Sequence, residues 1–400
     1  MSDFSSLKYD VIVCGAGPAG LKASYELLLK SKGELSVLLL DRKEPWKEPV
    51  LCAEAVSTDA FRKYWTIKDS FVRSALSGIY FVSPSGYKAE FYSKDCGLQL
   101  NRAELHRDIW ASAKDLGLEY DFEVFCKKVN KTDAGWVLEA EKKGGRLSLE
   151  AKVLIDATGP GNKLTNHLKD FEKIENGKSD LEPAIFVVAE NVPHETDHIE
   201  LYFGNFFKGG YGWVFPRSGG EVNLGLVVSS FYERKESTRQ LLDMFIQERF
   251  PGIKIKGYYG GSIACSGSEP KQIAKDGLFK AGDAASTVNP ISRSGIVEAL
   301  KSGTIAANAA LEWLQAKTDK EKSEIENRAF ECWMKIQGKT HSRIAKAKKA
   351  FAYLPDKKLD KAAKRLSKLS REKSTLFRIF FEVLAGAPSL IWKMRSFLKG

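Results

Sequence analysis

The feature that most constrains the fold is a glycine-rich turn close to the N-terminus, the sequence GAGPAG at residues 15–20. An apolar strand pattern at residues 9–14 precedes this turn, and a helical pattern over residues 21–30 follows it. A second apolar strand pattern at residues 35–41 ends on an acid. This order is typical of a β-α-β unit that binds a dinucleotide. The sequence therefore predicts an α/β fold that begins with a Rossmann-type domain.

Each part of the turn has a physical role in such a site. Gly15 allows the tight turn, Gly17 lets the backbone approach a pyrophosphate, and Gly20 lets the helix pack closely. The helix N-terminus then faces the phosphate charge, which its dipole favours. Asp41, at the end of the second strand, can accept hydrogen bonds from a ribose diol. A merely structural turn is the alternative, and the context favours dinucleotide binding.

Three later elements favour FAD over NAD. Arg102 opens a helical pattern, the sequence DATG at residues 156–159 ends a strand, and a strand pattern at residues 277–281 is followed by Gly282 and Asp283. In this order they resemble the FAD-binding motifs of the p-hydroxybenzoate hydroxylase-like superfamily. The resemblance implies that Asp283 binds the ribitol chain and that Arg102 contacts the cofactor. It also implies FAD contacts from Ala19, Arg42, Cys52, Ala53, Ala157, Gly159, Gly282, Pro290, Gly295 and Ile296.

The chain contains no second GxGxxG sequence, so a built-in NAD(P)H domain is not expected. Electrons must then come from a transient donor, either NAD(P)H or a small redox protein such as ferredoxin. The six cysteines are scattered and form no CxxC pair. This distribution favours a reducing, cytoplasmic setting and gives no reason to expect a metal site.

The middle of the chain has a different pattern. Strand-like runs at residues 184–192, 199–204 and 222–229, with a hairpin expected at residues 78–92, predict a second, mostly antiparallel sheet. We therefore expect a Rossmann-type FAD-binding domain with an inserted antiparallel substrate domain and a helical C-terminal region. The expected boundaries are 1–75, 97–172 and 269–340 for the FAD-binding domain, 76–96 and 173–268 for the substrate domain, and 341–400 for the basic helical region.

The most specific segment is YGWVFP at residues 211–216, followed by Asn223 and Gly225. It resembles the YxWxFP signature of the geranylgeranyl reductase family. The segment PVLCAEAVS at residues 49–57 resembles that family's Cys-Gly-Glu segment, and the resemblance covers residues 8–310 in motif order. It implies reduction of isolated C=C bonds in a polyprenyl (geranylgeranyl-type) lipid or its diphosphate, as in lipid biosynthesis. Hydride would move from flavin N5 to one carbon, and a proton would be added to the other.

Aromatic side chains on a strand suit this chemistry, since burying an isoprenoid chain contributes about 0.8 kcal/mol per methylene. Tyr211 and Trp213 can stabilise positive charge that develops on a tertiary carbon. Phe215 and Pro216 complete the expected substrate contacts. Cys52 is either the proton donor or a residue that shapes the pocket. Ordinary core packing of Tyr211 and Trp213 stays the alternative.

One departure from the family pattern bears on the substrate. After Asp283 the reductases usually run NPxxGGGI, whereas this chain reads NPISRSGI at residues 289–296. Arg293 either adds positive charge near reduced flavin or fills part of the substrate cavity, so it is a candidate substrate residue. A flavin-dependent monooxygenase or halogenase of the same fold is the rival hypothesis. An electron-transfer flavoprotein is another, although such proteins often add an iron–sulfur module that needs a cysteine cluster.

The C-terminal part of the chain carries the net charge. Residues 343–400 hold 16 Lys and Arg against 4 Asp and Glu, while the rest of the chain is nearly neutral. This asymmetry argues against a nucleic-acid-binding body and for an anionic membrane surface or an acidic partner; a solvated helical face is the alternative.

Apolar residues recur at helical spacing among these charges, namely Leu359, Ala363, Leu366, Leu369 and Leu376. This pattern predicts a basic amphipathic helix that lies on a membrane. The apolar stretch at residues 376–392 is too interrupted to cross one. We therefore expect a cytoplasmic enzyme with peripheral attachment to the inner face of the membrane.

Overall fold

The computed structural model describes residues 7–379 apart from 49, 162–163, 172–180, 231, 233–234, 266–272, 353, 374 and 376–378. The expectations for Leu376 and for nearly all of residues 376–392 therefore lie outside the described residues. Two compact units share the chain. The first comprises Met1–Val50, Arg102–Gly177 and Ala264–Ser342, and the second comprises Leu51–Asn101, Lys178–Ile263 and Arg343–Gly400. Residues 51–75 thus fall in the second unit, and so do the described residues beyond 342, which were expected to form a separate region.

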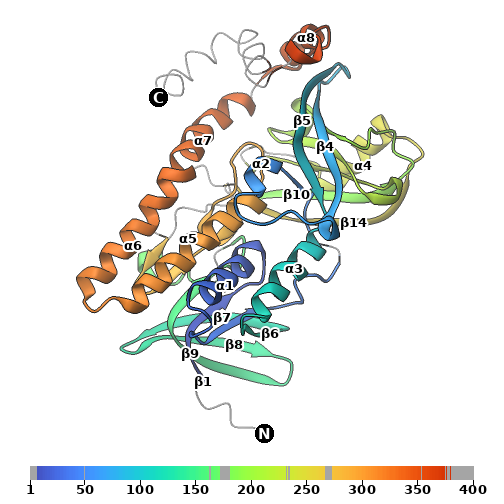
Figure 1. Ribbon diagram of the computed structural model, residues 1–400. Coiled ribbons are helices and arrows are strands. Elements are labelled where there is room, and N and C mark those ends of the chain that lie inside the picture. The colour runs from blue at the N-terminus through green and yellow to red at the C-terminus, as the bar shows by residue number, and fades with distance from the viewer. Residues whose placement is uncertain are drawn as a thin grey trace. The chain divides into compact units, whose positions relative to one another are not determined.

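The first unit is built on a mostly parallel sheet with the order β15-β16-β9-β1-β2-β6 (Figure 1). These strands are β1 (Leu7–Cys14), β2 (Val37–Asp41), β6 (Glu119–Phe122), β9 (Gly145–Asp156), β15 (Ala274–Lys275) and β16 (Leu278–Lys280). The central strand β1 pairs with both β2 and β9, and its residues 11–14 are fully buried. A parallel strand covered on both faces needs such an uninterrupted apolar run. The hairpin β7 (Val124–Thr132) and β8 (Gly135–Lys142) extends the sheet through β9.

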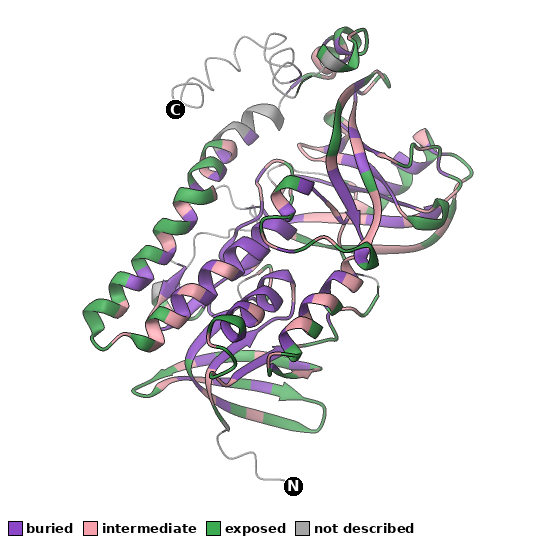
Figure 2. Cartoon of the chain, viewed as in Figure 1, coloured by how far each residue is buried: buried purple, intermediate pink, exposed green. Residues whose placement is uncertain are grey.

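Helices cover this sheet. They are α1 (Pro18–Lys30), α3 (Arg102–Lys114), α5 (Ile296–Gln315) and α6 (Asp319–Trp333). Helix α1 packs against both α3 and α5, and Figure 2 shows the buried residues gathered on α1, α5 and the sheet strands. Gly303 allows the close contact of α1 with α5, since a Cβ atom there would lie 2.3 Å from the Ala19 carbonyl oxygen.

The second unit is built on a sheet with the order β14-β10-β13-β12-β11-β4-β5-β3. Its strands are β3 (Ala55–Val56), β4 (Val72–Val82), β5 (Lys88–Leu100), β10 (Leu181–Glu190), β11 (His198–Tyr202), β12 (Tyr211–Pro216), β13 (Val222–Val227) and β14 (Lys254–Ala264). The expected hairpin at residues 78–92 is the antiparallel pair β4 and β5. Strand β11 pairs with β4 in parallel, so the sheet is mostly but not wholly antiparallel.

Strand alternation gives this sheet two different faces. Helix α4 (Thr238–Arg249) begins with a capping box at Ser237 and Gln240 and covers one face, where Val214 and Leu224 are buried with Phe245. The opposite face carries a second apolar cluster. Many of the apolar side chains packed against this cluster are only partly buried.

The chain continues from α6 through a π-helical turn (Met334–Gly338) into α7 (Lys339–Ala352) and α8 (Asp356–Leu366). Helix α8 packs on β5 within the second unit. The second unit also contains the short helices α2 (Thr58–Phe61) and η8 (Arg371–Lys373). Among the described helices, none combines the length and apolarity that a membrane span requires.

Candidate cofactor and substrate sites

The glycine turn forms a cradle at the end of β1. Gly15 adopts φ +105°, and a Cβ atom there would lie 2.2 Å from the Ala157 carbonyl oxygen. A Cβ atom at Gly20 would lie 1.8 Å from the Gly15 oxygen, so both glycines are required by packing. Gly17 differs, because a Cβ atom there would have no other atom within 4 Å, and it caps α1 without a side-chain hydrogen bond. This open space beside a helix N-terminus fits a pyrophosphate.

Asp41 is joined to this cradle. Its Oδ2 accepts from the Ala16 amide at 2.6 Å, and its Oδ1 accepts from the Lys43 amide at 3.1 Å. Burial raises the pKa of Asp41, while the Ala16 and Lys43 amides oppose that rise. The carboxylate therefore orders the turn. Arg42, next to it, is exposed.

The strand-end element at residues 156–159 lies against the same turn. The Ala157 amide donates to the Cys14 carbonyl at 2.8 Å. Asp156 accepts from the hydroxyls of Thr158 at 2.7 Å and Thr165 at 3.0 Å, which fixes the end of β9. Gly159 adopts φ +87° with open space beside it, as a backbone that approaches a ligand requires.

Arg102 and Asp283 are two charged residues of the first unit that interact electrostatically. Burial raises the pKa of Asp283 to about 6, and the charge of Arg102 opposes that rise. Arg102 Nε donates to His106 Nε2 at 3.2 Å, and His106 Nδ1 lies 2.7 Å from the Pro45 carbonyl oxygen. Burial lowers the pKa of His106 to about 3, so this imidazole is neutral at pH 7. The neutral ring positions the arginine, a support that sequence reasoning missed.

The turn that departs from the family pattern lies at the N-terminus of α5. Asn289 Oδ1 accepts from the amides of Ile291 and Ser292, both at 3.0 Å. Arg293 adopts the left-handed conformation, with φ +58°, and its guanidinium donates to the Ile291 carbonyl at 2.7 Å. Pro290 and Ile296 are buried beside this turn, and Gly295 caps the helix. A Cβ atom at Gly295 would lie 3.9 Å from Asp283 Oδ1, so this turn and the Gly-Asp turn are neighbours.

In the second unit, one hydrogen-bonded chain joins two of the expected catalytic residues. Trp213 Nε1 donates to Asn223 Oδ1 at 2.8 Å, and Asn223 Nδ2 donates to the Cys52 carbonyl at 2.9 Å. Asn223 is fully buried. The Cys52 thiol accepts from the Glu54 amide at 3.3 Å. The structure therefore brings Cys52 and Trp213 to one place, with Asn223 as the connecting residue.

Glu54 is the main residue that the sequence reasoning left without a role. It adopts φ +69° and is 1% exposed. Arg217 donates to its carboxylate at 2.7 Å, and Arg73 lies 3.9 Å away. Gln99 holds the neighbouring Ala53 carbonyl at 2.8 Å. This buried ion pair and these bonds fix the segment that carries Cys52. The sequence placed Glu54 in a segment that resembles the family's, but it did not indicate which residues Glu54 contacts.

The aromatic residues of β12 share a face. The ring centroids of Tyr211 and Trp213 are 6.1 Å apart, and those of Trp213 and Phe215 are 6.4 Å apart. Gly225 makes room for the indole, since a Cβ atom there would lie 2.5 Å from it. By strand alternation Pro216 points to the opposite face, so the structure does not bring it to these rings.

Comparisons with known proteins agree on one family. The model of the geranylgeranyl reductase catalytic domain matches residues 180–261. The chain is 29% identical to the digeranylgeranylglycerophospholipid reductase of Methanosarcina acetivorans, over 98% of this chain and 96% of that protein. The identity to the reductase of the same name from Methanosarcina mazei is also 29%, over 98% and 97%.

Solved structures share the fold. A geranylgeranyl bacteriochlorophyll reductase-like protein of Thermoplasma acidophilum superposes with a TM-score of 0.88 at 22% identity, over 98% of this chain and all of that one. The flavin-dependent brominase Bmp2 superposes with a TM-score of 0.67 at 18% identity, over 96% and 100%. The α/β fold with a Rossmann-type domain and a second sheet is therefore confirmed.

Proposed function

Because the chain belongs to the geranylgeranyl reductase family of flavin-dependent oxidoreductases, we propose that it saturates isolated C=C bonds of a polyprenyl lipid. The relatives' names support this substrate class, since those reductases act on a geranylgeranylated glycerophospholipid by name. The observation that carries the proposal is the hydrogen-bonded chain from the Trp213 indole through the buried Asn223 to the Cys52 carbonyl, because it connects the aromatic strand to the segment that bears a thiol.

FAD is the cofactor, and the residues of the first unit fit it. The open side of Gly17 would receive the pyrophosphate, Asp41 the ribose, and Asp283 the ribitol chain. Arg102 supplies positive charge beside them, held by the neutral His106. When bound and reduced, FAD supplies a hydride from N5. The donor that reduces it is a transient one, NAD(P)H or a small redox protein.

The chain's own residues have three tasks in the reaction. Trp213 and Tyr211 offer ring faces to a carbon that becomes electron-poor as its neighbour is protonated. Asn223 accepts the hydrogen bond of the indole N–H and so fixes the orientation of the ring. Cys52 is the proposed proton donor: its S–H bond would break as the alkene carbon takes the proton, and the Glu54 amide would hydrogen-bond the thiolate left behind. One carbon gains the proton and the other gains the hydride.

We propose that the enzyme is located in the reducing cytoplasm and acts at the inner surface of the membrane. A polyprenyl lipid is held in a bilayer, so the enzyme must meet it there. The six cysteines are scattered along the chain, and the charge of residues 343–400 suits an anionic surface. Arg293, whose guanidinium binds its own turn, remains a proposed neighbour of the substrate.

The test is anaerobic. Purified protein is reduced with dithionite and mixed with a geranylgeranylated lipid, and the flavin absorbance and the lipid mass are followed. We expect flavin reoxidation with a lipid mass gain of whole hydrogen pairs, and loss of both in Trp213→Ala. Reoxidation only by oxygen, with hydroxylation or halogenation of an aromatic substrate, would establish the rival oxygenase function.

A further inference from the structure

Helix α8 is attached to the β4–β5 hairpin through its acidic residues. Asp360 accepts from the Ser83 hydroxyl at 2.7 Å, and from the amide and hydroxyl of Ser85, both at 2.8 Å. One turn earlier, Asp356 accepts from the Asn205 amide at 2.8 Å. The helix is therefore held by its side chains against the turn of the hairpin and against the loop that follows β11.

The apolar face of this helix is already covered. Leu366 is 3% exposed and packs with Ala89, Phe81 and Phe91 of the hairpin. Ala363 is buried as well, and Leu369 packs against the same cluster. The amphipathic helix expected from the sequence forms, but its apolar residues contact the protein instead of being free to enter a bilayer.

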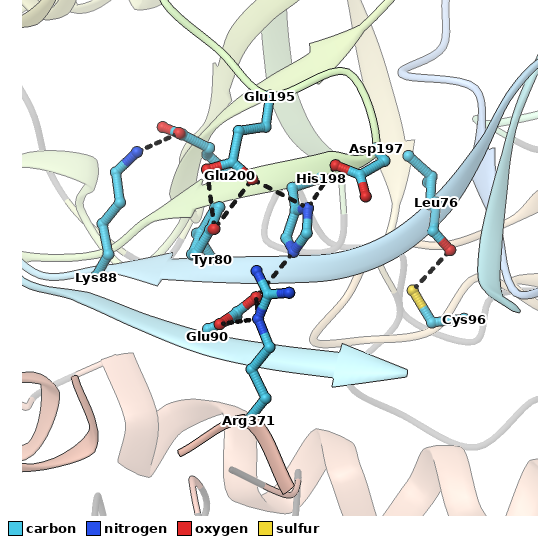
Figure 3. A network of polar contacts seen from close by, with 10 residues as sticks. All are labelled: Leu76, Tyr80, Lys88, Glu90, Cys96, Glu195, Asp197, His198, Glu200 and Arg371. Carbon is cyan, nitrogen blue, oxygen red and sulfur yellow. Dashed lines mark hydrogen bonds and ion pairs between the residues drawn. The ribbon is translucent and has the colours of Figure 1, made fainter. Parts of the chain in front are cut away.

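A second attachment follows the helix (Figure 3). Arg371 Nε lies 2.9 Å and 3.1 Å from the two carboxylate oxygens of Glu90, and its guanidinium stacks 4.9 Å from the Tyr92 ring centroid. Glu90 in turn lies 3.2 Å from Nε2 of the buried His198. Two acids and one arginine thus set the orientation of α8 on the hairpin.

This orientation turns a row of cations outward. We call it the basic stripe: Lys357, Lys361, Lys364, Arg365 and Lys368, all exposed. At 100° per residue the four positions within α8 fall within about a quarter to a third of the helix circumference, opposite Ala363 and Leu366, and Lys368 follows just beyond the helix end. Each cation near an anionic lipid surface contributes about 1 kcal/mol, so five on one face form a substantial binding surface.

Beneath α8 begins a row of aromatic rings, here called the aromatic track. Phe81, which packs in the α8 cluster, stacks on Phe203 with centroids 6.1 Å apart. Phe203 lies 6.0 Å from Tyr211, which lies 6.1 Å from Trp213. The first three rings are half-buried and Trp213 is buried, so burial increases away from α8.

From these two features we infer that the docked α8 binds anionic phospholipid headgroups through the basic stripe, and that the prenyl chain enters the second unit at this end, along the aromatic track. The inference rests on the proposed function for its second part only. It differs from simple insertion of an amphipathic helix, because the apolar face stays on the protein and the attachment is electrostatic. Such binding weakens steeply with salt.

The first test measures binding of the full-length protein to vesicles that contain equal parts of phosphatidylglycerol and phosphatidylcholine. Lys357→Gln/Lys361→Gln/Lys368→Gln is compared with a control that loses the same charge from exposed lysines of the first unit, Lys320→Gln/Lys335→Gln/Lys339→Gln. We expect roughly 100-fold weaker binding for the first variant and wild-type binding for the control. If both variants bind the vesicles equally well, or if the protein prefers a DNA duplex to the vesicles, the basic stripe is not a lipid-binding surface.

The second test maps the track with a photo-crosslinking amino acid, p-benzoylphenylalanine, in place of Phe203. The control carries it in place of Phe125, which is 40% exposed in the first unit. We expect a geranylgeranylated lipid in vesicles to crosslink at position 203 and not at position 125. Crosslinking at 125 alone, or at neither, overturns the entry route. Failure of the proposed reaction is seen separately, as absent flavin reoxidation by lipid dispersed in detergent.

Discussion

Asn223 offers the sharpest test of the substrate site, since one buried side chain makes both bonds of the connecting chain. In Asn223→Leu the Trp213 indole N–H and the Cys52 carbonyl both lose their partner. An unsatisfied buried polar group costs about 1–3 kcal/mol, so the two together predict a loss of about 2–6 kcal/mol in unfolding free energy. Asn223→Asp keeps the acceptor for the indole but sets a carboxylate against the Cys52 carbonyl in a fully buried site, so at pH 7 we expect a loss at least as large as that of Asn223→Leu.

The assays are urea unfolding, FAD content and anaerobic turnover of a prenyl lipid. A positioning role predicts that FAD content is retained while kcat falls more than KM rises. Trp136→Phe is the control, because Trp136 is as buried as Trp213 and also donates one indole hydrogen bond, to the Asp276 carbonyl at 3.0 Å, in the first unit. That carbonyl also accepts from Lys131, so we expect a smaller loss, roughly 1–2 kcal/mol, and unchanged turnover. The reasoning fails if Asn223→Leu matches the wild type in stability and turnover.

Three further outcomes follow from the first unit. Gly17→Val fills the open side of the cradle without a clash, so the protein should fold with a wild-type circular dichroism spectrum but lack flavin absorbance. The pKa of Asp283 is raised to about 6, so the folded apo-protein loses stability relative to the unfolded chain as the pH rises from about 4 through 6. Asp283→Asn should therefore stabilise the apo-protein by up to about 3 kcal/mol at pH 8 and not at pH 4. The same substitution should weaken FAD binding. Arg293→Gly removes a left-handed penalty of about 1–2 kcal/mol and one hydrogen bond of similar worth, so thermal unfolding should shift little; a large shift would show a further role of the side chain.

The cofactor half of the molecule could be predicted because its signals are local. A buried strand, a glycine turn and a terminal acid are neighbours in sequence, and parallel strands bring their carboxyl ends to one edge. The helical pattern expected over residues 21–30 lies within α1, and the pattern that Arg102 opens is α3, which begins at that residue. Strands β7, β8 and the first part of β9 were missed, because many of their exposed positions are Lys or Glu, which are uncommon in strands.

The substrate half depended on long-range pairs that no local pattern contains. Glu54 and Arg217 are 163 residues apart, and neither position by itself indicates a buried ion pair. The periodicity predicted one amphipathic pattern from Leu359 to Leu376; the helix forms with Ala363 and Leu366 on its apolar face but ends at Leu366, and Leu369 lies beyond it. It could not identify what covers that face, since a pattern defines which side is apolar and not which surface binds it.

Arg293 departs from the family motif, but the backbone conformation that the motif requires at this position is kept. Glycine is favoured in such a turn because the backbone there adopts positive φ, and position 293 does adopt it, at +58°. The arginine meets part of the strain by bonding its guanidinium to the Ile291 carbonyl, while Asn289 holds the amides of the same turn. The turn geometry that leads into α5 is therefore built without the family's glycine. The substitution alters the chemistry that the turn presents more than its backbone path, so it is weaker grounds against a reductase than the sequence alone suggested.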